Sequence, residues 1–372
     1  MLIFNVYLFV IFSIKKDDGI LDTVENVVRA IKFKGPEYVP IQYLTYHLKN
    51  LFELSDIVEL SCGPPKDWRP SKLGESVWGF VFDTADGRAW GMGRPKNPPL
   101  TSWDKLKSFK FPDPHDKSRF ESPIYSTANR ATLPSAKSLI KKWGKTRYLL
   151  GGLDLTMFSL MQCLRGDAEI MIDMYRNRDM VKELADKLME NHIGLIEMWS
   201  SYGANGVICY DDFGTQKGLF FHPKLCKEIL LPRYQKMIQV AHKHGMQFIH
   251  HCCGNIYEII ESLIEMKLDV IQLDQPELAG GGDSSGIDRL GKSFGGRICF
   301  MAGVDIQGTL IKGTLSDIES ESRHLIETFG SYDGGFIARL YTGPESIGLT
   351  SDSPQYETMY NTFRKYGKYP RK

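Results

Sequence analysis

Short apolar runs alternate with longer segments of helical spacing along most of the chain. A helix is expected from residue 20 to residue 34, with an apolar face formed by Val24, Val27, Val28 and Ile31. Seven apolar runs predict strands, and a weaker eighth completes the pattern; the seven lie at residues 38–43, 147–152, 206–210, 248–251, 269–273, 298–304 and 334–340. Helical segments follow the strands, so we expect parallel strands joined by right-handed crossovers.

This alternation predicts an α/β protein with a (β/α)8 barrel of the TIM type. Neither a Gly-x-Gly-x-x-Gly motif nor a phosphate-binding loop follows an early strand, which weighs against a nucleotide-binding, doubly wound sheet. Residues 60–135 are rich in Pro, Gly and Trp, and they include a predicted hairpin with strands at 77–84 and 88–92 and a turn at 85–87. We interpret this region as an elaboration of one barrel domain that covers residues 20–372.

The first 14 residues are almost entirely apolar and are followed by Lys15 and Lys16. A membrane-spanning helix needs about 20 apolar residues, and a signal peptide needs a positively charged start and a small-residue cleavage site. We therefore interpret residues 1–19 as an apolar extension outside the barrel core. Three interpretations of this extension stay open: a translation start upstream of the true one, an extra segment that packs on the barrel, and an anchor at a membrane surface. No other stretch is apolar enough to predict a membrane span.

The charge balance and the cysteines narrow the class of protein. Lys and Arg number 46 against 45 Asp and Glu, so the net charge is +1, and no basic block is present. A nucleic-acid partner is therefore not expected. The 7 cysteines are an odd number without disulfide-framework spacing, which predicts a cytoplasmic protein whose thiols are available to bind metal. The sequence leaves the oligomeric state open.

Polar residues stand at the C-terminal ends of successive predicted strands, which is where the active site of a (β/α)8 barrel lies. They are Asp211 and Asp212; His250, His251, Cys252 and Cys253; Asp274 and Gln275; Asp305 and Gln307; and Arg339 and Tyr341. An apolar core residue would be less costly at each position, so their succession predicts a functional site.

The strongest local signal is the segment HCCGN at residues 251–255. Side chains alternate along an extended segment, so His251 and Cys253 share one face while His250 and Cys252 share the other. An imidazole nitrogen beside a thiolate suits Zn²⁺, and a catalytic zinc needs about three protein ligands and an open position. We predict zinc on His251 and Cys253 with a third ligand elsewhere. The alternative is a reduced cysteine beside a buried core histidine.

Asp211 and Asp212 can supply a metal ligand, a general acid or a hydrogen-bond acceptor. Only one of two adjacent side chains can point over the barrel mouth, so we expect one to carry the chemistry and the other to cap a turn. Gln216 and Asp305 complete the predicted catalytic set, and helix capping is the alternative for Asp305 and its neighbour Gln307. The predicted substrate-binding residues are His250, Asn255, Gln307, Arg339 and Tyr341.

Several blocks of the sequence resemble the uroporphyrinogen decarboxylase superfamily, and the similarity covers nearly the whole chain from about residue 22. These blocks are residues 78–92, 97–114, 164–192, 210–277, 303–321 and 334–347. Members of the superfamily have a (β/α)8 barrel, which agrees with the strand count.

The superfamily contains decarboxylases of the tetrapyrrole pathway and cobalamin-dependent methyltransferases. The decarboxylases carry an arginine-rich segment after the first strand, which binds the acidic groups of their substrate. The corresponding residues 38–54 contain no arginine here. Without those cations a substrate with many carboxylates is poorly held, so the resemblance favours the methyltransferase branch.

Methyltransferases of this superfamily bind zinc through a His-x-Cys-Gly motif, which His251, Cys253 and Gly254 match. Their third ligand is a cysteine after the last strand, and Thr342 stands at about that position in this chain. The resemblance therefore implies zinc, while the departure at Thr342 implies a replacement ligand. A carboxylate of Asp211 or Asp212 is the most plausible oxygen ligand, and substrate coordination is an alternative.

The resemblance implies a zinc-dependent methyltransferase that moves a methyl group between a small methylated substrate and the cobalt of a corrinoid. Aryl methyl ethers are one substrate class to consider. The chain shows no cobalamin-binding motif of its own, so cobalamin is expected on a separate corrinoid-binding protein that docks at the barrel mouth. Two alternatives are a decarboxylase that works without metal and a non-catalytic tetrapyrrole- or corrinoid-binding protein, for which the missing third cysteine is the best argument.

Overall fold

The computed structural model describes residues 22–45, 51–72, 74–82, 95–126 and 131–369. The apolar extension predicted at residues 1–19 lies outside these described residues. The predicted hairpin turn and its return strand at 88–92 lie outside them as well.

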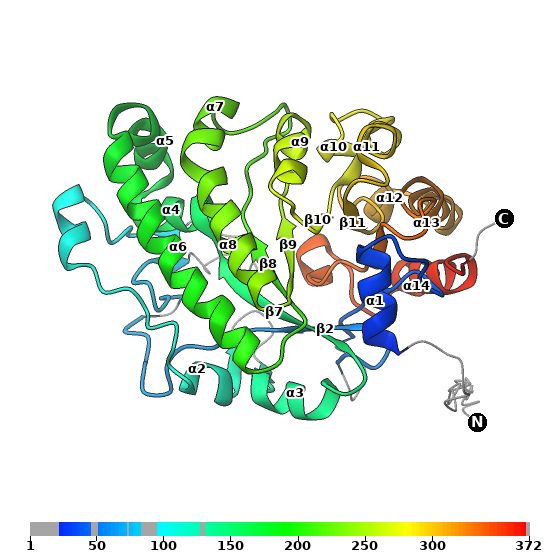
Figure 1. Cartoon of the computed structure of the whole chain (residues 1–372), viewed down its shortest axis with the longest axis horizontal. Helices are drawn as coiled ribbons and strands as arrows, with labels where there is room; N and C mark the ends of the chain where they lie inside the picture. Colours follow the sequence, from blue (N-terminus) through cyan, green and yellow to red (C-terminus); the bar gives the residue numbers. More distant parts are fainter. Residues whose placement is uncertain (1–21, 46–50, 73, 83–94, 127–130, 370–372) are drawn as a thin grey trace, which may run out of the picture.

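Eight parallel strands form a nearly closed barrel, which confirms the expected (β/α)8 fold (Figure 1). They are β1 (Ile41–Gln42), β2 (Ile57–Leu60), β7 (Tyr148–Leu155), β8 (Gly206–Tyr210), β9 (Gln247–His251), β10 (Val270–Leu273), β11 (Cys299–Ala302) and β12 (Phe336–Arg339). The sheet runs in the order β1-β12-β11-β10-β9-β8-β7-β2. Asp56 joins its two edge strands, because its N–H donates to the Ile41 carbonyl and its Oδ2 accepts the Ile41 N–H, both at 2.8 Å.

Helices surround the barrel and fill the connections between its strands (Figure 1). They are α1 (Thr23–Ile31), α2 (Ser118–Glu121), α3 (Ala136–Trp143), α4 (Met157–Arg165), α5 (Asp167–Arg176), α6 (Arg178–Ser201), α7 (Pro223–Leu225), α8 (Leu231–Lys243), α9 (Tyr257–Glu265), α10 (Pro276–Ala279), α11 (Gly286–Phe294), α12 (Thr309–Lys312), α13 (Leu315–Phe329) and α14 (Pro354–Tyr366). Among the described residues, no helix combines the length and apolarity needed to cross a membrane.

The barrel interior near the N-terminal ends of the strands is an apolar core, and α1 covers this end of the barrel. Val27 and Ile31 of α1 are buried in one cluster with inward-facing residues of the strands, among them Tyr148, Ile208 and Ile249. Since every second strand residue faces inward, the next inward layer contains Tyr210 and His251. The barrel is therefore apolar where the strands begin and polar where they end.

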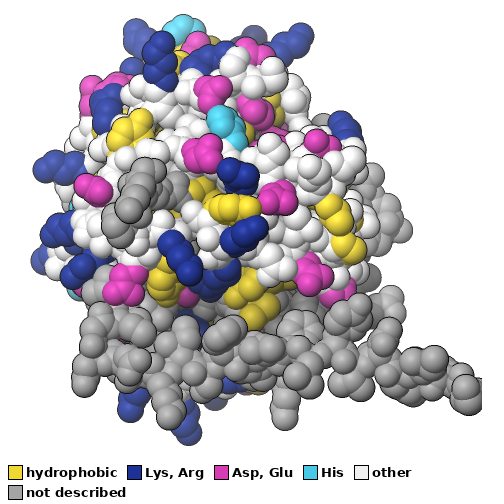
Figure 2. All heavy atoms as spheres, turned by 90° about the vertical axis from the view of Figure 1, so that its right-hand side faces the viewer, with side chains coloured by type: hydrophobic (Ala, Val, Ile, Leu, Met, Phe, Trp, Pro, Cys, Tyr) yellow, Lys and Arg dark blue, Asp and Glu magenta, His cyan; other side chains and the backbone are white. Residues whose placement is uncertain are grey.

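The described part of the 60–135 region contains two short antiparallel strand pairs, and one of their strands falls within the first predicted hairpin strand at 77–84. β3 (Val81–Phe82) pairs antiparallel with β4 (Pro95–Lys96), and β5 (Ile124–Ser126) pairs antiparallel with β6 (Ala131–Leu133). The face of the molecule shown in Figure 2 carries interspersed positive and negative side chains, in line with the net charge of +1.

Candidate metal centre

The end of β9 brings His251 and Cys253 together on the inner side of the barrel. His251 continues the inward-facing series of Ile249, and its side chain is 10% exposed. The Cys253 Sγ lies 3.5 Å from the His251 Nε2. Strand alternation therefore places these two side chains side by side, as the sequence pattern predicts.

Asp212, two residues beyond the end of β8, adds a carboxylate to this pair. Its Oδ1 lies 3.4 Å from the His251 Nε2 and accepts the Cys253 N–H at 2.8 Å. One ligand atom from each of Asp212, His251 and Cys253 lies within 4.8 Å of the others. The Asp212 side chain is 49% exposed, so the cluster is open to solvent on its side. These three residues are hereafter called the metal cluster.

The spacing of the metal cluster fits zinc. Zn–N and Zn–O bonds of about 2.1 Å and a Zn–S bond of about 2.3 Å place two tetrahedral ligand atoms about 3.3–3.6 Å apart. The distances of 3.4 Å and 3.5 Å from the His251 Nε2 fall in this interval. The same distances also suit ionic and hydrogen-bond contacts between metal-free side chains. The donor set of nitrogen, sulfur and oxygen is one that zinc accepts, with an open position left for substrate.

A hydrogen-bond chain behind His251 holds its ring in place. The Nδ1–H donates to the Oε1 of Gln272 on β10, and the Nε2 of Gln272 donates to the Oδ1 of Asp274 at 2.8 Å. This arrangement directs the Nε2 of His251 at Asp212 and Cys253. Metal-bound histidines in proteins have such a partner on their second nitrogen, which fixes the tautomer and the ring orientation.

Burial and neighbouring charges shift the pKa values of the metal cluster. Burial raises the pKa of the Cys253 thiol, and the Asp212 charge raises it further. Burial also acts to raise the pKa of Asp212, but the hydrogen bond and charge of His251 outweigh it and lower the pKa. Burial acts to lower the pKa of His251, yet Asp212 and Asp274 reverse this and raise the pKa. A bound metal therefore has to displace protons from the imidazole and the thiol.

Gly254 allows the chain to turn directly after Cys253. Its φ of 84° lies in the left-handed region, and a Cβ at this position would lie 2.2 Å from the backbone carbon of Gly214. The Gly214 N–H in turn donates to the Cys253 carbonyl at 3.1 Å. The loops after β8 and β9 are thus packed backbone to backbone, which fixes Asp212 relative to Cys253.

Asp211 faces away from the metal cluster and is fully buried. Its two oxygens accept the backbone N–H groups of Phe158 and Ser159 in the first turn of α4, at 2.9 and 2.6 Å, and the Tyr234 hydroxyl at 2.6 Å. Burial raises the pKa of Asp211 to about 6 against the opposing effect of these hydrogen bonds. Of the two aspartates, Asp211 caps a helix and Asp212 lies at the mouth.

His250, predicted to bind substrate, lies on the opposite side of β9. Its ring is 1% exposed and stacks on Tyr234 with ring centroids 4.8 Å apart, and Phe213 packs against its edge. Burial lowers the pKa of His250 to about 3. The alternation that directs His251 inward directs His250 outward against α8, so we withdraw it from the substrate-binding set.

The remaining predicted residues divide between the mouth and local turns. The Asp305 Oδ1 accepts the N–H groups of Gln307 and Gly308 at 2.9 Å, which is the capping alternative for this aspartate. The Asn255 Oδ1 accepts the Tyr257 N–H at 3.3 Å at the start of α9. The Gln216 Nε2 donates to the Gln307 Oε1 at 3.3 Å, which ties the loops after β8 and β11 together.

Arg339 lies at the end of β12, where it continues the inward-facing series of Ile337. The hydroxyl of Tyr341, two residues after Arg339, lies 3.1 Å from the Ser346 Oγ. Burial acts to lower the pKa of Arg339, but Asp274 and other negative neighbours raise it, so the guanidinium stays charged.

Sequence reasoning missed a further set of polar residues inside the barrel. The Glu59 carboxylate on β2 accepts the Tyr210 hydroxyl and, at 2.7 Å, the Nε2 of Gln42 on β1. The Tyr210 ring centroid lies 5.2 Å from that of His251, so this network adjoins the metal cluster. The available signal was a glutamate and two glutamines, Gln272 being the second, within otherwise apolar strands.

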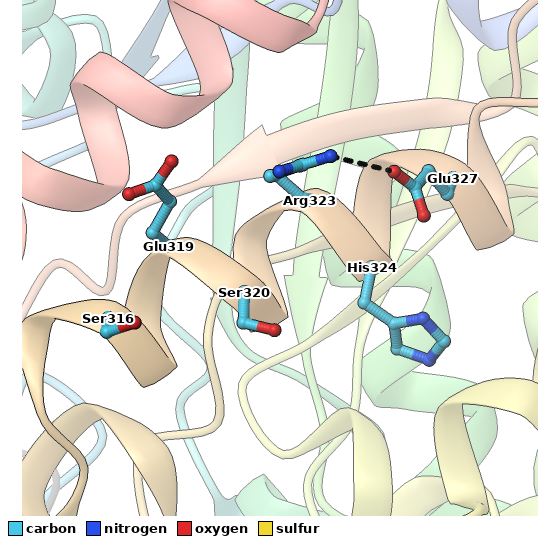
Figure 3. Close-up of a pocket in the computed structure, with 6 residues that line it drawn as sticks. All are labelled: Ser316, Glu319, Ser320, Arg323, His324 and Glu327. Atoms are coloured by element: carbon cyan, nitrogen blue, oxygen red, sulfur yellow. Dashed lines mark ion pairs between the residues drawn. The ribbon is translucent and has the colours of Figure 1, made fainter.

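A shallow surface groove lies along α13, away from the barrel mouth (Figure 3). Its charged side chains are already paired, since Arg323 lies 3.9 Å from Glu327 within the groove and His324 lies 3.0 Å from Asp288. All six side chains drawn come from this one helix. The chemistry of this protein is therefore to be sought at the mouth and not in this groove.

Residues 94–354 match the family described as Uroporphyrinogen decarboxylase (URO-D). The chain belongs to this family. The match spans β4 to the start of α14, so it includes Asp212, His251 and Cys253. No curated protein matches the sequence.

Among solved structures, a methyltransferase from Methanosarcina mazei is similar over 93% of this chain and 99% of its own, with a TM-score of 0.64 and 16% identity. At this identity the likeness shows that the barrel fold is shared. A xylose isomerase-like TIM barrel protein from Mycobacterium smegmatis covers 62% of this chain and 77% of its own, with a TM-score of 0.38 and 13% identity. A D-allulose 3-epimerase from Methylomonas sp. covers 62% and 79%, with a TM-score of 0.39 and 10% identity. Neither of the last two bears on the function of this chain.

Proposed function

We propose that this protein is a zinc-dependent methyltransferase that moves a methyl group between a small methylated substrate and the cobalt of a separate corrinoid protein. The observation that carries the proposal is the metal cluster at the mouth of a URO-D family barrel. The similar barrel from Methanosarcina mazei is named a methyltransferase, which supports the choice of this branch.

Each residue of the metal cluster has a defined part in this proposal. Asp212, His251 and Cys253 hold the metal, and Gln272 contacts the His251 Nδ1 and so directs the Nε2 at the metal. Bound zinc supplies Lewis acidity, which makes an ether oxygen, a thiol or an amine of the methylated substrate a better leaving group. The half-exposed side of Asp212 leaves room for that substrate atom to approach.

Asp212 takes the place of the third cysteine of the zinc methyltransferases. Thr342, which stands at about that cysteine's position, accepts a hydrogen bond from the Arg339 Nη2 at 3.3 Å and is not in the metal cluster. A neutral hydroxyl is a weak zinc ligand, whereas the Asp212 carboxylate supplies both a donor oxygen and a negative charge. The ligand set is then one nitrogen, one sulfur and one oxygen.

Uroporphyrinogen decarboxylation is the second candidate, and the family description favours it. Its substrate bears carboxylates around the whole macrocycle and needs several cations to hold it. The segment at residues 38–54 contains no arginine. We therefore place decarboxylation second.

The corrinoid is assigned to a partner because the chain has no cobalamin-binding motif. In the proposed reaction the bond between the leaving atom and the methyl carbon breaks, and a cobalt(I) corrinoid on the partner would supply the nucleophile that accepts this carbon. The electron pair of the broken bond stays on the leaving atom, which then takes up a proton. The partner has to dock over the barrel mouth for the cobalt to reach the methyl group.

Metal analysis together with a methyl-transfer assay tests the proposal. The purified protein should hold about one zinc per chain, and the zinc-loaded protein should accelerate demethylation of methylcobalamin by a thiol, followed by visible absorbance. The Cys253→Ala variant is the control and should lose both properties while staying folded. A protein that binds no zinc and releases carbon dioxide from uroporphyrinogen contradicts the proposal and supports the second candidate.

A further inference from the structure

Three buried polar atoms without partners gather on the inner side of two neighbouring strands. Gln42 of β1 and Arg339 of β12 are paired in the parallel register, and they are 1% and 3% exposed. The Oε1 of Gln42 and the Nε and Nη1 of Arg339 have no hydrogen-bond partner in the described part of the chain. Buried polar groups in proteins are nearly always paired, so these three atoms call for a partner that the described part of the chain does not supply.

The orientation of the Gln42 amide is fixed by its other end. Its Nε2 donates to the Glu59 Oε2 at 2.7 Å, and Glu59 also accepts the Tyr210 hydroxyl. Turning the amide over would set its oxygen against the Glu59 carboxylate, which is unfavourable. The Gln42 carbonyl oxygen is therefore an acceptor directed away from Glu59, on the strand next to that of Arg339.

Arg339 has only one polar contact among the described residues, from its Nη2 to the Thr342 Oγ1 at 3.3 Å. The guanidinium belongs to the same end of the barrel as the metal cluster, because Arg339 is the last residue of β12 and continues the inward-facing series of Ile337. A permanently charged guanidinium, with its Nε and Nη1 unpaired in the described part of the chain, thus lies in the same mouth as the metal cluster.

We infer that Arg339 binds an oxyanion, a carboxylate or a sulfonate, on the small substrate of the proposed zinc site. The inference rests on the proposed function for the reaction that this substrate undergoes. Two parallel N–H groups of a guanidinium, from Nη2 together with either Nε or Nη1, match two oxygens of such an anion. Nη2 carries two hydrogens, so one is left besides the hydrogen bond to Thr342. The Gln42 Oε1 accepts a hydrogen bond from a donor group next to that anion. The Nε and Nη1 are shielded from solvent here, so binding requires the segment around Thr342 to shift.

Equilibrium titration of the zinc-loaded protein with matched probes tests the inference. The probes are 4-methoxybenzoate, 4-methoxybenzenesulfonate and the neutral 4-methoxybenzamide, which share a ring and differ in the head group. Acetate, methanesulfonate and acetamide repeat the comparison without the ring. We expect at least one anion to bind about 10- to 100-fold more tightly than the amide, and the two anions separate carboxylate from sulfonate recognition.

Arg339→Gln should abolish this preference, and Arg339→Lys should keep part of it because the charge stays while the fork is lost. Arg297→Gln is the matched control, since Arg297 is a surface residue that pairs with Glu261. If Arg339→Gln fails to fold, as judged by circular dichroism, the anion preference of Arg339→Lys tests the inference in its place.

Equal binding of anion and amide by the parent protein, or no anion binding at millimolar concentration, overturns the inference. Reduced stability of Arg339→Gln with an unchanged preference also overturns it, because Arg339 then serves only internal contacts, for example to Gln42. Zinc content measured on the same samples separates the two proposals. Anion preference without zinc defeats the proposed function alone, whereas zinc without anion preference defeats this inference alone.

Discussion

Replacing each of the two adjacent aspartates by asparagine is expected to separate stability from metal binding. Asp211 is fully buried and accepts three hydrogen bonds, two from the first turn of α4 and one from Tyr234. Asp212 is half-exposed and contacts His251 and the Cys253 N–H. The two carboxylates are neighbours in sequence but serve opposite sides of the barrel wall.

The magnitude for Asp211→Asn follows from counting acceptors. The carboxylate has two acceptor oxygens, whereas the amide has one, so one of the three buried donors loses its partner. A buried donor without an acceptor costs about 1–3 kcal/mol, and loss of a helix cap costs about 0.5–2 kcal/mol. We expect the free energy of unfolding to fall by about 1–3 kcal/mol, with zinc content unchanged.

Asp212→Asn should behave in the opposite way. An amide is a far weaker zinc ligand than a carboxylate, so bound zinc and methyl transfer should fall by orders of magnitude. The metal-free protein should lose about 1 kcal/mol or less, because the side chain is half-exposed. Urea unfolding of the metal-free variants, followed by circular dichroism, measures stability, and metal analysis after dialysis measures zinc. If Asp211→Asn loses zinc as fully as Asp212→Asn, or if both keep parental zinc and activity, the assignment is wrong.

Three further outcomes rest on neighbouring contacts. Cys253→Ala should remove most of the zinc by metal analysis, whereas Cys252→Ala should keep it because its side chain is buried behind the strand; equal zinc content would refute the ligand assignment. Gln272→Leu removes the acceptor of the His251 Nδ1–H and should weaken zinc about 10- to 100-fold in chelator competition; unchanged affinity would count against that role. Burial raises the pKa of Glu321 in the folded state, so its stabilising contribution is complete in acid and is lost as pH rises through that pKa. Glu321→Gln should therefore melt above the parent in alkali, with a difference that shrinks towards acid, and a pH-independent difference would contradict this.

The barrel was predictable because most of its strands are continuous apolar runs with a helix behind them. β2 gave the faintest signal, since its four residues include Glu59, whose side chain serves the polar network inside the barrel. A charged residue that faces the barrel mouth lowers the apolar character of a short strand. The residues that make the mouth polar thus also make their strands hard to detect.

The metal cluster could be predicted in part. His251 and Cys253 are two residues apart on one strand, so alternation alone places them together. Gln272 and Asp274 come from the next strand, and their position behind His251 depends on the register between β9 and β10, which pairs His251 with Gln272. The sequence of one strand alone does not reveal which residue of the neighbouring strand lies beside a given position.

The choice between Asp211 and Asp212 shows where sequence reasoning ends. In a barrel both faces of a strand are buried, one against the interior and one against the helices, so β8 is apolar at nearly every position and carries no inward–outward pattern. Which residues of β8 face inward can be determined only when the position of one of them is known, as for Ile208 in the interior core. From Ile208 the alternation leads through Tyr210 to Asp212, and Asp211 is directed at the N-terminus of α4. In the proposed site an oxygen ligand replaces a sulfur ligand because the inward–outward alternation along β8 directs Asp212 at the barrel mouth. The paired asparagine variants test that alternation directly.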